Sequence, residues 1–157
     1  MNNMNFQKTE EKTYWLCILN RKNWEVVKKE NVWGVSERHK NQLNKAKIGD
    51  VFIFYTISEL TGRERTESEI TGIFEVASKP YKDNKKLFSS VGTRHFGEIF
   101  PYRIKVKPLE IFENPIAFRP LTKKLSFITN KKRWSLHLLG AAMKAIPKED
   151  YDLLASM

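Results

Sequence analysis

The chain has 157 residues, of which 41% are hydrophobic and 29% charged, a balance typical of one globular domain rather than a disordered segment. Its 28 lysines and arginines exceed its 18 acidic residues, and the formal net charge of +10 favours a polyanionic partner such as nucleic acid. No apolar run is long enough to span a membrane and no signal peptide is evident, so we expect a cytoplasmic protein without a membrane partner. The lone cysteine, Cys17, excludes an internal disulfide and is expected in the core.

The first part of the chain passes from a polar segment into a strongly apolar run. We expect residues 1–12 to form a flexible segment ahead of a single domain over residues 13–157. The continuous apolar run 14–19 predicts a buried strand. Asn20 follows it directly and is a good N-cap, so a helix is predicted over residues 21–29.

A second helix and a second strand are predicted next along the chain. Ser36 is a suitable N-cap for a helix that runs to residue 47, with Leu43 and Ala46 facing the core. A Gly-Asp pair ends this helix, and the apolar residues 51–57 predict a strand.

The middle of the chain combines a third strand with two polar connections. Residues 58–69 are polar and turn-like, and residues 70–77 predict a strand. Gly72 lies inside that strand, which indicates a bulge or the close approach of another backbone. Residues 79–98 are rich in lysine and are expected to be irregular.

Residues 102–107 alternate strictly between apolar and cationic side chains, which predicts a strand with one solvent-exposed face. The expected core residues are Tyr102, Ile104 and Val106, and the expected solvent-facing residues are Arg103, Lys105 and Lys107.

The last third of the chain is predicted to hold two helices. Two short apolar pieces in residues 109–121 are interrupted by Pro115 and Pro120. An apolar stripe with helical spacing predicts a helix over residues 136–145. Pro147 suits the first position of a final short helix that runs to residue 154.

The order of these elements predicts an α+β fold with a small curved sheet or barrel, because the strands pair mostly with near neighbours and the helices do not strictly alternate with them. Catalytic and metal-binding signatures are lacking in the sequence. The histidines His39, His95 and His137 are scattered, and no Gly-rich phosphate loop or nucleophile motif occurs. We therefore expect no metal, no cofactor and no catalytic residues.

A basic tract without any acidic residue covers residues 115–136. The aromatic residues Phe118, Phe127 and Trp134 are interleaved with its cations, and cations that hold phosphates beside rings that stack bases suit nucleic-acid binding. The alternative is that the rings belong to the core and the cations are solvated. The predicted phosphate-binding residues are Arg119, Lys123, Lys124, Lys131, Lys132 and Arg133.

The four tryptophans differ in their expected roles. Trp15 lies in an apolar strand and Trp24 on the inner face of a helix, so both are expected in the core, whereas Trp134 fits either role. Trp33 precedes Gly34 and Val35 at a connection, where a ring can form one wall of a pocket and glycine lets a ligand approach the backbone.

Six sequence pieces, in order across residues 13–155, carry a resemblance to a known family. The chain resembles the EVE domain family, a branch of the PUA-like superfamily related to YTH domains, as a stand-alone member. The pieces are Tyr-Trp-Leu-Cys at 14–17, Val-Trp-Gly-Val at 32–35, Ile-Gly-Asp-Val-Phe-Ile-Phe-Tyr at 48–55, Ile-Phe-Glu-Val at 73–76, Phe-Pro-Tyr-Arg-Ile-Lys-Val at 100–106 and Phe-Ile-Thr-Asn-Lys-Lys-Arg-Trp at 127–134.

The resemblance implies a small β-barrel flanked by helices, with a pocket for a flipped, modified base. Trp33 and Gly34 match a cage tryptophan and its small neighbour in YTH domains, and Asn20 matches a base-contacting polar residue, although it can equally be only a helix cap. The second wall is expected from residues 79–100, which depart from the YTH pattern because they contain no tryptophan. The predicted ligand-binding residues are Trp33, Gly34, Val35, Asn20, Tyr55, Phe88 and Phe96.

The resulting functional hypothesis is a non-enzymatic module that reads a modified base, either a modified cytosine or methyladenine, in DNA or RNA. A second hypothesis is a PUA-like protein that binds structured RNA irrespective of modification. A third is a nucleic-acid-processing enzyme that uses Glu67, Glu69 or His95, motivated only by their nearness to the expected pocket.

Overall fold

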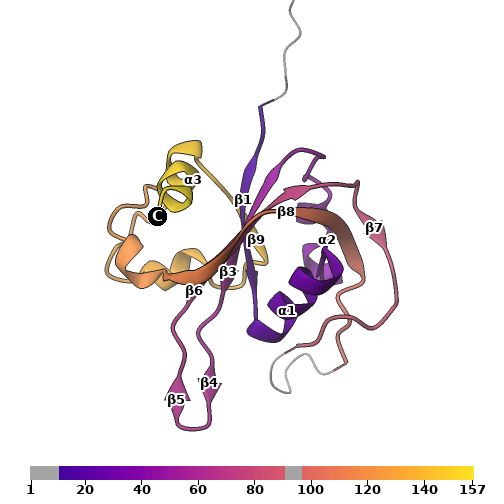
Figure 1. Cartoon of the computed structure of the whole chain (residues 1–157), viewed down its shortest axis with the longest axis horizontal. Helices are drawn as coiled ribbons and strands as arrows, with labels where there is room; N and C mark the ends of the chain where they lie inside the picture. The colour runs from indigo at the N-terminus through magenta and orange to yellow at the C-terminus, as the bar shows by residue number, and fades with distance from the viewer. Residues whose placement is uncertain (1–10, 91–96) are drawn as a thin grey trace, which may run out of the picture.

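The computed structural model describes residues 11–90 and 97–157 (Figure 1). Most of the segment 1–12, which we expect to be flexible, lies outside the described residues. Within them the main sheet has seven strands. These are β1 (Tyr14–Leu19), β2 (Val32–Val35), β3 (Val51–Thr56), β6 (Glu69–Val76), β7 (Tyr81–Lys82), β8 (Tyr102–Ala117) and β9 (Met143–Ile146).

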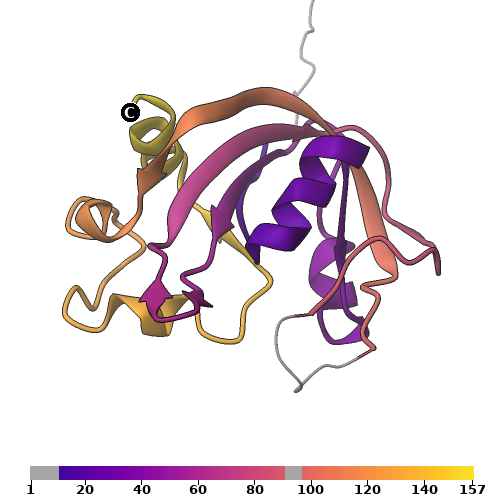
Figure 2. The same cartoon turned by 60° about the horizontal axis from the view of Figure 1, so that its bottom comes forward.

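The sheet is mixed and strongly curved. Its strand order is β2-β8-β6-β3-β1-β9, with β7 also paired to β8. Strands β1 and β3 run parallel, and the other described pairs are antiparallel. The 16 residues of β8 start beside β2 and β7 and end beside β6, so this one strand carries the sheet round its bend (Figure 2). The predicted α+β fold with a curved sheet flanked by helices is confirmed.

Helices cover both faces of the sheet (Figure 1). On one face lie α1 (Arg21–Glu30), η2 (Glu37–His39) and α2 (Lys40–Leu43), and on the other lie η3 (Arg119–Leu121), η4 (Trp134–His137) and α3 (Lys148–Ala155). The helices predicted after Asn20 and Pro147 are confirmed as α1 and α3. The helix predicted to run to residue 47 is wrong in length, because it ends at Leu43, although Leu43 and Ala46 are buried as expected.

The helix predicted over residues 136–145 is wrong. Its first residues belong to the 3₁₀ helix η4, and Gly140 has a positive φ of 74°, after which the chain extends into β9. The apparent apolar stripe is not buried, since Leu136 is 47% and Leu139 is 79% exposed. Strand β9 instead pairs with β1 from Tyr14 to Cys17, where it supplies backbone partners for the edge of the sheet.

The segment predicted as two short pieces around Pro115 is also different, because it continues strand β8 to Ala117. Beyond Lys107 the described partner of β8 is β6 alone, so this half of the strand is an edge. Proline is tolerated on an edge strand because its missing N–H is not needed on the open side. Pro108 lies beside a register shift between β6 and β8, which relaxes the pairing further.

The polar connector over residues 58–69 contains a small hairpin. Strands β4 (Leu60–Thr61) and β5 (Glu64–Arg65) pair antiparallel and form a separate two-stranded sheet. The strand that follows, β6, contains Gly72 as predicted. A Cβ atom at Gly72 would lie 2.5 Å from Cη2 of Trp24, and the register of β6 shifts beside this residue. The same Cβ atom would lie 3.2 Å from the carbonyl oxygen of Glu110, so the predicted approach of another backbone is confirmed, and the register shift agrees with the predicted bulge.

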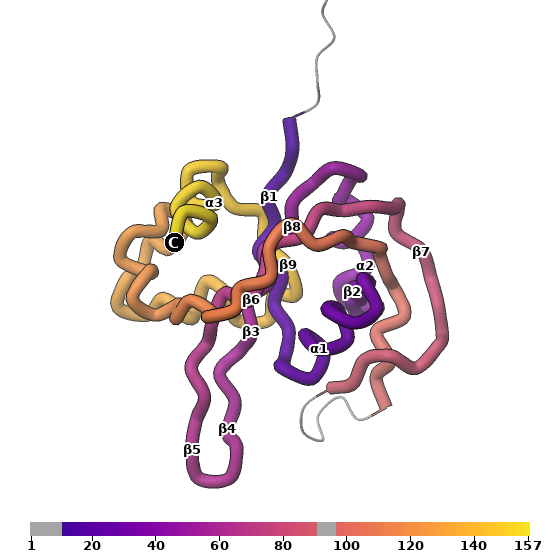
Figure 3. The backbone as a smooth tube through the Cα atoms, viewed as in Figure 1, coloured from indigo at the N-terminus to yellow at the C-terminus, as the bar shows by residue number. Residues whose placement is uncertain are grey.

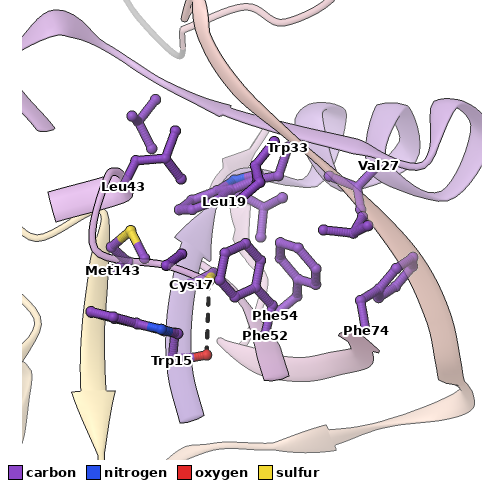
Figure 4. Packing of buried hydrophobic residues seen from close by; sticks show 14 of the residues in the cluster. Trp15, Cys17, Leu19, Val27, Trp33, Leu43, Phe52, Phe54, Phe74 and Met143 are labelled. Carbon is purple, nitrogen blue, oxygen red and sulfur yellow. Dashed lines mark hydrogen bonds between the residues drawn. The ribbon is translucent and has the colours of Figure 1, made fainter. Parts of the chain in front are cut away.

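Two buried clusters fill the two faces of the sheet. The first is rich in aromatic rings and includes Trp15, Cys17, Trp24 and Trp33 (Figure 4). The expected core positions of Trp15, Trp24 and Cys17 are confirmed, and burial raises the pKa of the Cys17 thiol well above its ordinary value. The second cluster is mainly aliphatic, and its members include Leu16, Ile53, Ile73, Leu121, Leu125, Ile128 and Leu154.

Candidate functional site

A recess of about 220 Å³ opens on the aromatic face of the sheet. Residues Trp33, Gly34 and Val35 of β2 form one wall, and Asn20 and Asn23 lie where β1 passes into α1. Further lining residues are Ile18, Leu19, Ser36, His39, Ile57, Ser90, Phe100 and Ala142. The volume lies below the range of about 300–1,000 Å³ for pockets that take drug-sized ligands, so the recess suits a single flat ring system.

Trp33 is both a core residue and a wall of this pocket. Only 2% of its surface is exposed, and its ring packs edge to face against Phe52 at 5.5 Å and Phe54 at 6.0 Å between centroids (Figure 4). Edge-to-face packing holds an indole ring in one orientation. The part of Trp33 that borders the recess is therefore fixed in place before any ligand binds.

Gly34 serves a different purpose from the one the sequence indicated. A Cβ atom here would lie 2.7 Å from the carbonyl oxygen of Phe100 and 3.1 Å from the ring of Phe88. The space beside the glycine is therefore taken by the chain itself, and the absence of a side chain lets Phe88 and Phe100 pack against β2. Phe100 in turn contributes to the pocket lining.

Asn20 caps the first helix and anchors the same loop. Its Oδ1 accepts a hydrogen bond from the backbone N–H of Asn23 at 2.7 Å, and its Nδ2 donates to the carbonyl of Ser89 at 3.0 Å. Asn23 completes the clamp, because its side chain donates to the same carbonyl at 3.0 Å and accepts from the Ser89 N–H at 2.9 Å. The predicted cap is confirmed, and Asn20 also lines the pocket.

Arg103 is fully buried, which corrects its predicted position on the solvent side of β8. Its Nε donates to the carbonyl of Phe100 and its Nη2 to that of Ile99, both at 3.1 Å, and Nη2 also donates to the carbonyl of Lys85. Its Nη1 lies 3.7 Å from Oδ2 of Asp83. The alternating pattern missed this role because it assumes that water covers the second face of the strand, whereas parts of residues 83–90 and 97–100 cover Arg103 here.

His39 is a further pocket residue that sequence reasoning did not assign to the site. It lies in η2, shortly after the tryptophan-bearing strand, and this closeness in sequence to Trp33 was the only available signal. Burial, together with the nearby charge of Arg38, lowers the pKa of His39 below its ordinary value. The imidazole is therefore mainly neutral at pH 7 and can both donate and accept hydrogen bonds.

Two of the predicted ligand-binding rings, Tyr55 and Phe88, do not line the pocket. Tyr55 points to the other face of the sheet, where its ring packs edge to face on Phe118 at 4.8 Å. The side chains of Phe54 and Tyr55 alternate along β3, so only Phe54 joins the Trp33 cluster. Phe88 is 1% exposed and lies behind the wall, packed against Phe100 and beneath Arg103, and Phe96 lies outside the described residues.

The basic tract covers the opposite, aliphatic face of the sheet (Figure 1). Phe118 is buried there with Trp134 packed on it at 5.5 Å, and the ring of Phe127 lies beneath the Lys144 ammonium at 5.7 Å. These rings serve packing in this structure rather than presenting free stacking faces.

The six predicted phosphate-binding cations of the tract differ in their contacts. The Lys131 ammonium donates to the carbonyls of Thr122 at 3.0 Å and Leu125 at 2.7 Å, and the Arg119 guanidinium lies 4.0 Å from the carboxylate of Glu67. All six residues are exposed, including the remaining four, Lys123, Lys124, Lys132 and Arg133.

The acidic residues named in the enzyme hypothesis take part in surface ion pairs. Glu69 bonds to the guanidinium of Arg21 at 3.0 Å, Glu67 faces Arg119, and His95 lies outside the described residues. Among the residues that the structure describes, no group of three or more His, Cys, Asp or Glu side chains is placed to hold a metal ion. No helix in this part of the chain is long and apolar enough to cross a membrane.

A curved mixed sheet with flanking helices and a recess on its aromatic face defines a small α+β module. The sequence model of the EVE domain family matches residues 13–157, and the chain belongs to this family. The resemblance seen in the sequence is therefore confirmed. A UPF0310 protein of Pyrococcus abyssi is 51% identical over 145 residues, which cover 92% of this chain and 99% of the relative.

Two solved structures show the same fold at low sequence identity. Human THYN1, in complex with DNA containing 5-methylcytosine, has a TM-score of 0.59 at 15% identity and covers 92% of this chain and 96% of its own. The YTH domain of Zygosaccharomyces rouxii MRB1, in complex with N6-methyladenosine RNA, has a TM-score of 0.63 at 10% identity and covers 99% of this chain and 92% of its own.

Proposed function

We propose that the protein binds nucleic acid and holds one flipped, modified base against Trp33, without catalysing a reaction on it. The observation that carries this proposal is the rigid aromatic wall in a recess of about 220 Å³, the size of one ring system. Two structures of this fold hold a nucleic acid with a methylated base, which supports the proposal.

Each lining group has a defined part in this proposal. The Trp33 ring stacks on the base, and a methyl group adds apolar surface to that contact. Asn20, His39 and the backbone of Gly34 and Val35 supply polar contacts to the base edge. Asn20 has one amide N–H left for this purpose, since its Oδ1 already caps α1 and one N–H holds Ser89.

The energies indicate that the pocket alone is insufficient and that the basic surface is required. Stacking contributes about 1–3 kcal/mol per base, and flipping a paired base costs a few kcal/mol. Net affinity then comes largely from phosphate contacts, for which we propose the exposed cations Lys123, Lys124, Lys132 and Arg133. Binding of this kind weakens steeply as salt rises, because condensed counterions are no longer released as favourably.

The test is a titration of single- and double-stranded DNA and RNA carrying 5-methylcytosine, N6-methyladenine or no modification, at two salt concentrations. Trp33→Leu is compared with Trp24→Leu, since both tryptophans are buried in the same cluster but only Trp33 lines the pocket. We expect a preference for one modified base, reduced about tenfold by Trp33→Leu, in line with the loss of one stacking contact, and retained in Trp24→Leu. Equal losses in both variants would refute the pocket assignment.

Binding of structured RNA is a second candidate function, and the position of the basic tract favours it. The exposed cations lie over the opposite face of the sheet from the pocket, so they can contact phosphates without base recognition. This alternative predicts that folded RNA competes with modified single strands and that Trp33→Leu binds it as tightly as the parent protein. The reader hypothesis predicts weak competition.

A further inference from the structure

A two-stranded arm projects from the body of the protein beside the pocket (Figures 1 and 3). The arm comprises residues 58–67, and every residue from Leu60 to Arg65 is exposed. Gly62 takes a positive φ of 65° in the two-residue turn between β4 and β5, as glycine does in tight hairpins. None of these residues is needed to bury the core, so the arm is available for contact with a partner.

The base of the arm is joined directly to the pocket. Ile57 lines the recess, and its N–H donates to the carbonyl of Leu19 at 3.0 Å. Leu60 is three residues further on, and an extended chain of that length spans no more than about 11 Å. A nucleic acid with one base in the pocket therefore has its neighbouring nucleotides within reach of the arm.

The arm is also held in a fixed direction relative to α1. The Glu59 carboxylate accepts from the backbone N–H of Arg21 at 2.9 Å, and the Arg21 guanidinium donates to the carbonyl of Glu67 at 2.9 Å. Across the arm, Thr66 accepts from the N–H of Glu59 and donates its own N–H to the Glu59 carbonyl, at 2.9 and 2.7 Å. Both strands of the arm are thus tied to the start of the helix that carries the pocket asparagines.

The two faces of the arm differ chemically. Leu60 pairs with Arg65 and Thr61 with Glu64, and cross-strand partners share a face while successive pairs alternate. One face therefore presents an apolar side chain, 64% exposed, beside a guanidinium, and the other presents a hydroxyl beside a carboxylate. Arg63 at the turn adds a second cation at the tip.

We propose that the Leu60–Arg65 face of the arm enters the duplex beside the flipped base, so that the preferred ligand is base-paired nucleic acid. A two-stranded ribbon fits the major groove of DNA, leucine is a suitable wedge between unstacked bases, and arginine pairs with phosphates or base edges. The wedge compensates for the stacking that is lost when the base leaves the helix. This inference rests on the proposed function and extends it to the class of nucleic acid.

The test compares the double variant Leu60→Ala/Arg65→Ala with the control Leu109→Ala/Lys107→Ala. The control also removes an exposed leucine and an exposed cation, but from β8, and neither residue lines the pocket. The probes are short duplexes and the matching single strands, carrying 5-methylcytosine in DNA or N6-methyladenine in RNA. Fluorescence anisotropy gives the affinities, and 2-aminopurine placed beside the modified base reports unstacking.

For whichever probe binds, we expect the arm variant to lose about tenfold in affinity for the duplex, in line with the loss of a wedge contact. We expect little change for the single strand, and a smaller rise in 2-aminopurine fluorescence with the duplex. The control should behave like the parent protein. The role of the arm would be overturned if the arm variant kept its affinity for the duplex, or if it lost affinity equally for the single strand and the duplex. Either result would leave the pocket function intact. If the parent protein binds none of the probes, the proposed function and this inference both fail.

Discussion

The two faces of the sheet are packed with different kinds of side chain, and the recess that Trp33 lines lies on the aromatic one. On the first face, Trp33, Phe52 and Phe54 meet edge to face, and Trp33 also borders the recess. On the second face, branched aliphatic residues pack closely together, and the segment that covers them contributes buried leucines to the same cluster. The comparison shows that the Trp33 recess lies on the side of the curved sheet where aromatic rings, rather than aliphatic side chains, form the core.

Each face also anchors an irregular segment with a buried polar side chain. Asn20 and Asn23 hold the backbone of Ser89 beside the pocket. Asp150, on the other face, accepts from the N–H groups of Ser126 and Phe127 at 2.8 and 2.9 Å. On both faces, then, buried polar side chains hold the backbone of a covering segment. Any difference between the faces in ligand binding must therefore come from the part of the sheet that each segment covers.

The largest expected effect comes from removing one buried ring on each face. Trp33→Ala and Phe118→Ala should each lower the free energy of unfolding by about 3–5 kcal/mol, because both leave a cavity in a packed cluster. Only Trp33→Ala should also abolish the preference for a modified base. Chemical denaturation measures the stability and anisotropy titration measures the binding. Loss of the preference in Phe118→Ala as well would show that the two faces do not differ in base recognition.

Arg103→Met is expected to be the next most disruptive change. It leaves the carbonyls of Lys85, Ile99 and Phe100 without their donor, which should cost about 1–3 kcal/mol of stability. Hydrogen exchange in residues 83–90 should accelerate, and ligand affinity should fall because the loop carries part of the pocket lining. Arg119→Met is the matched control, since that side chain is 71% exposed and its ion pair contributes little.

Two substitutions of Asn20 distinguish its role as the helix cap from its hydrogen bond to Ser89. Asn20→Ala removes both and should cost about 1 kcal/mol for the lost cap, with a further loss for the anchor. Asn20→Ser keeps a capping oxygen but has no amide to donate to Ser89. We expect intermediate stability in thermal denaturation, with ligand affinity as low as in Asn20→Ala. Full affinity in the serine variant would show that the Ser89 contact does not shape the pocket.

The smallest effect that we expect is a pH dependence of folding stability that originates at His39, in the pocket wall. Because burial lowers the pKa of His39 in the folded state, the unfolded chain binds its proton more readily. The contribution of His39 to stability is therefore complete above about pH 6.5, the ordinary histidine value, and declines as the pH falls below it. Relative to His39→Gln, the parent protein should therefore lose melting temperature as the pH falls from neutral to mildly acidic. A constant difference would show that the ring titrates normally.

The structure agrees with the sequence where local pattern and burial coincide. The apolar run ending at Leu19 and the N-cap Asn20 were sufficient to predict β1 and α1, because a continuous apolar run and a capping side chain act within a few residues. The aromatic-glycine pair at Trp33 and Gly34 pointed to the pocket wall for a similar reason, since it marks a place where two parts of the chain meet closely.

The errors occur where distant segments decide the outcome. Residues 143–146 have a helical pattern but extend, because the free edge of β1 needs a backbone partner. Arg103 has the spacing of a solvent-facing residue but is buried, because residues 85, 99 and 100 supply carbonyl acceptors for its Nε and Nη2. Tyr55 is next to the aromatic cluster in sequence but lies on the other face, because successive side chains of a strand alternate.

The sequence by itself determined the family, the main strands, the terminal helices and the tryptophan that forms the pocket wall, all of which depend on local pattern or on ordered motifs. Only the tertiary structure decided which groups surround that tryptophan and on which face the basic tract lies. The physical reason is that the curved sheet brings His39, Phe100 and Ala142 to one recess from elements far apart in the chain, and hydrogen bonds and packing between such elements leave no periodic trace in the sequence.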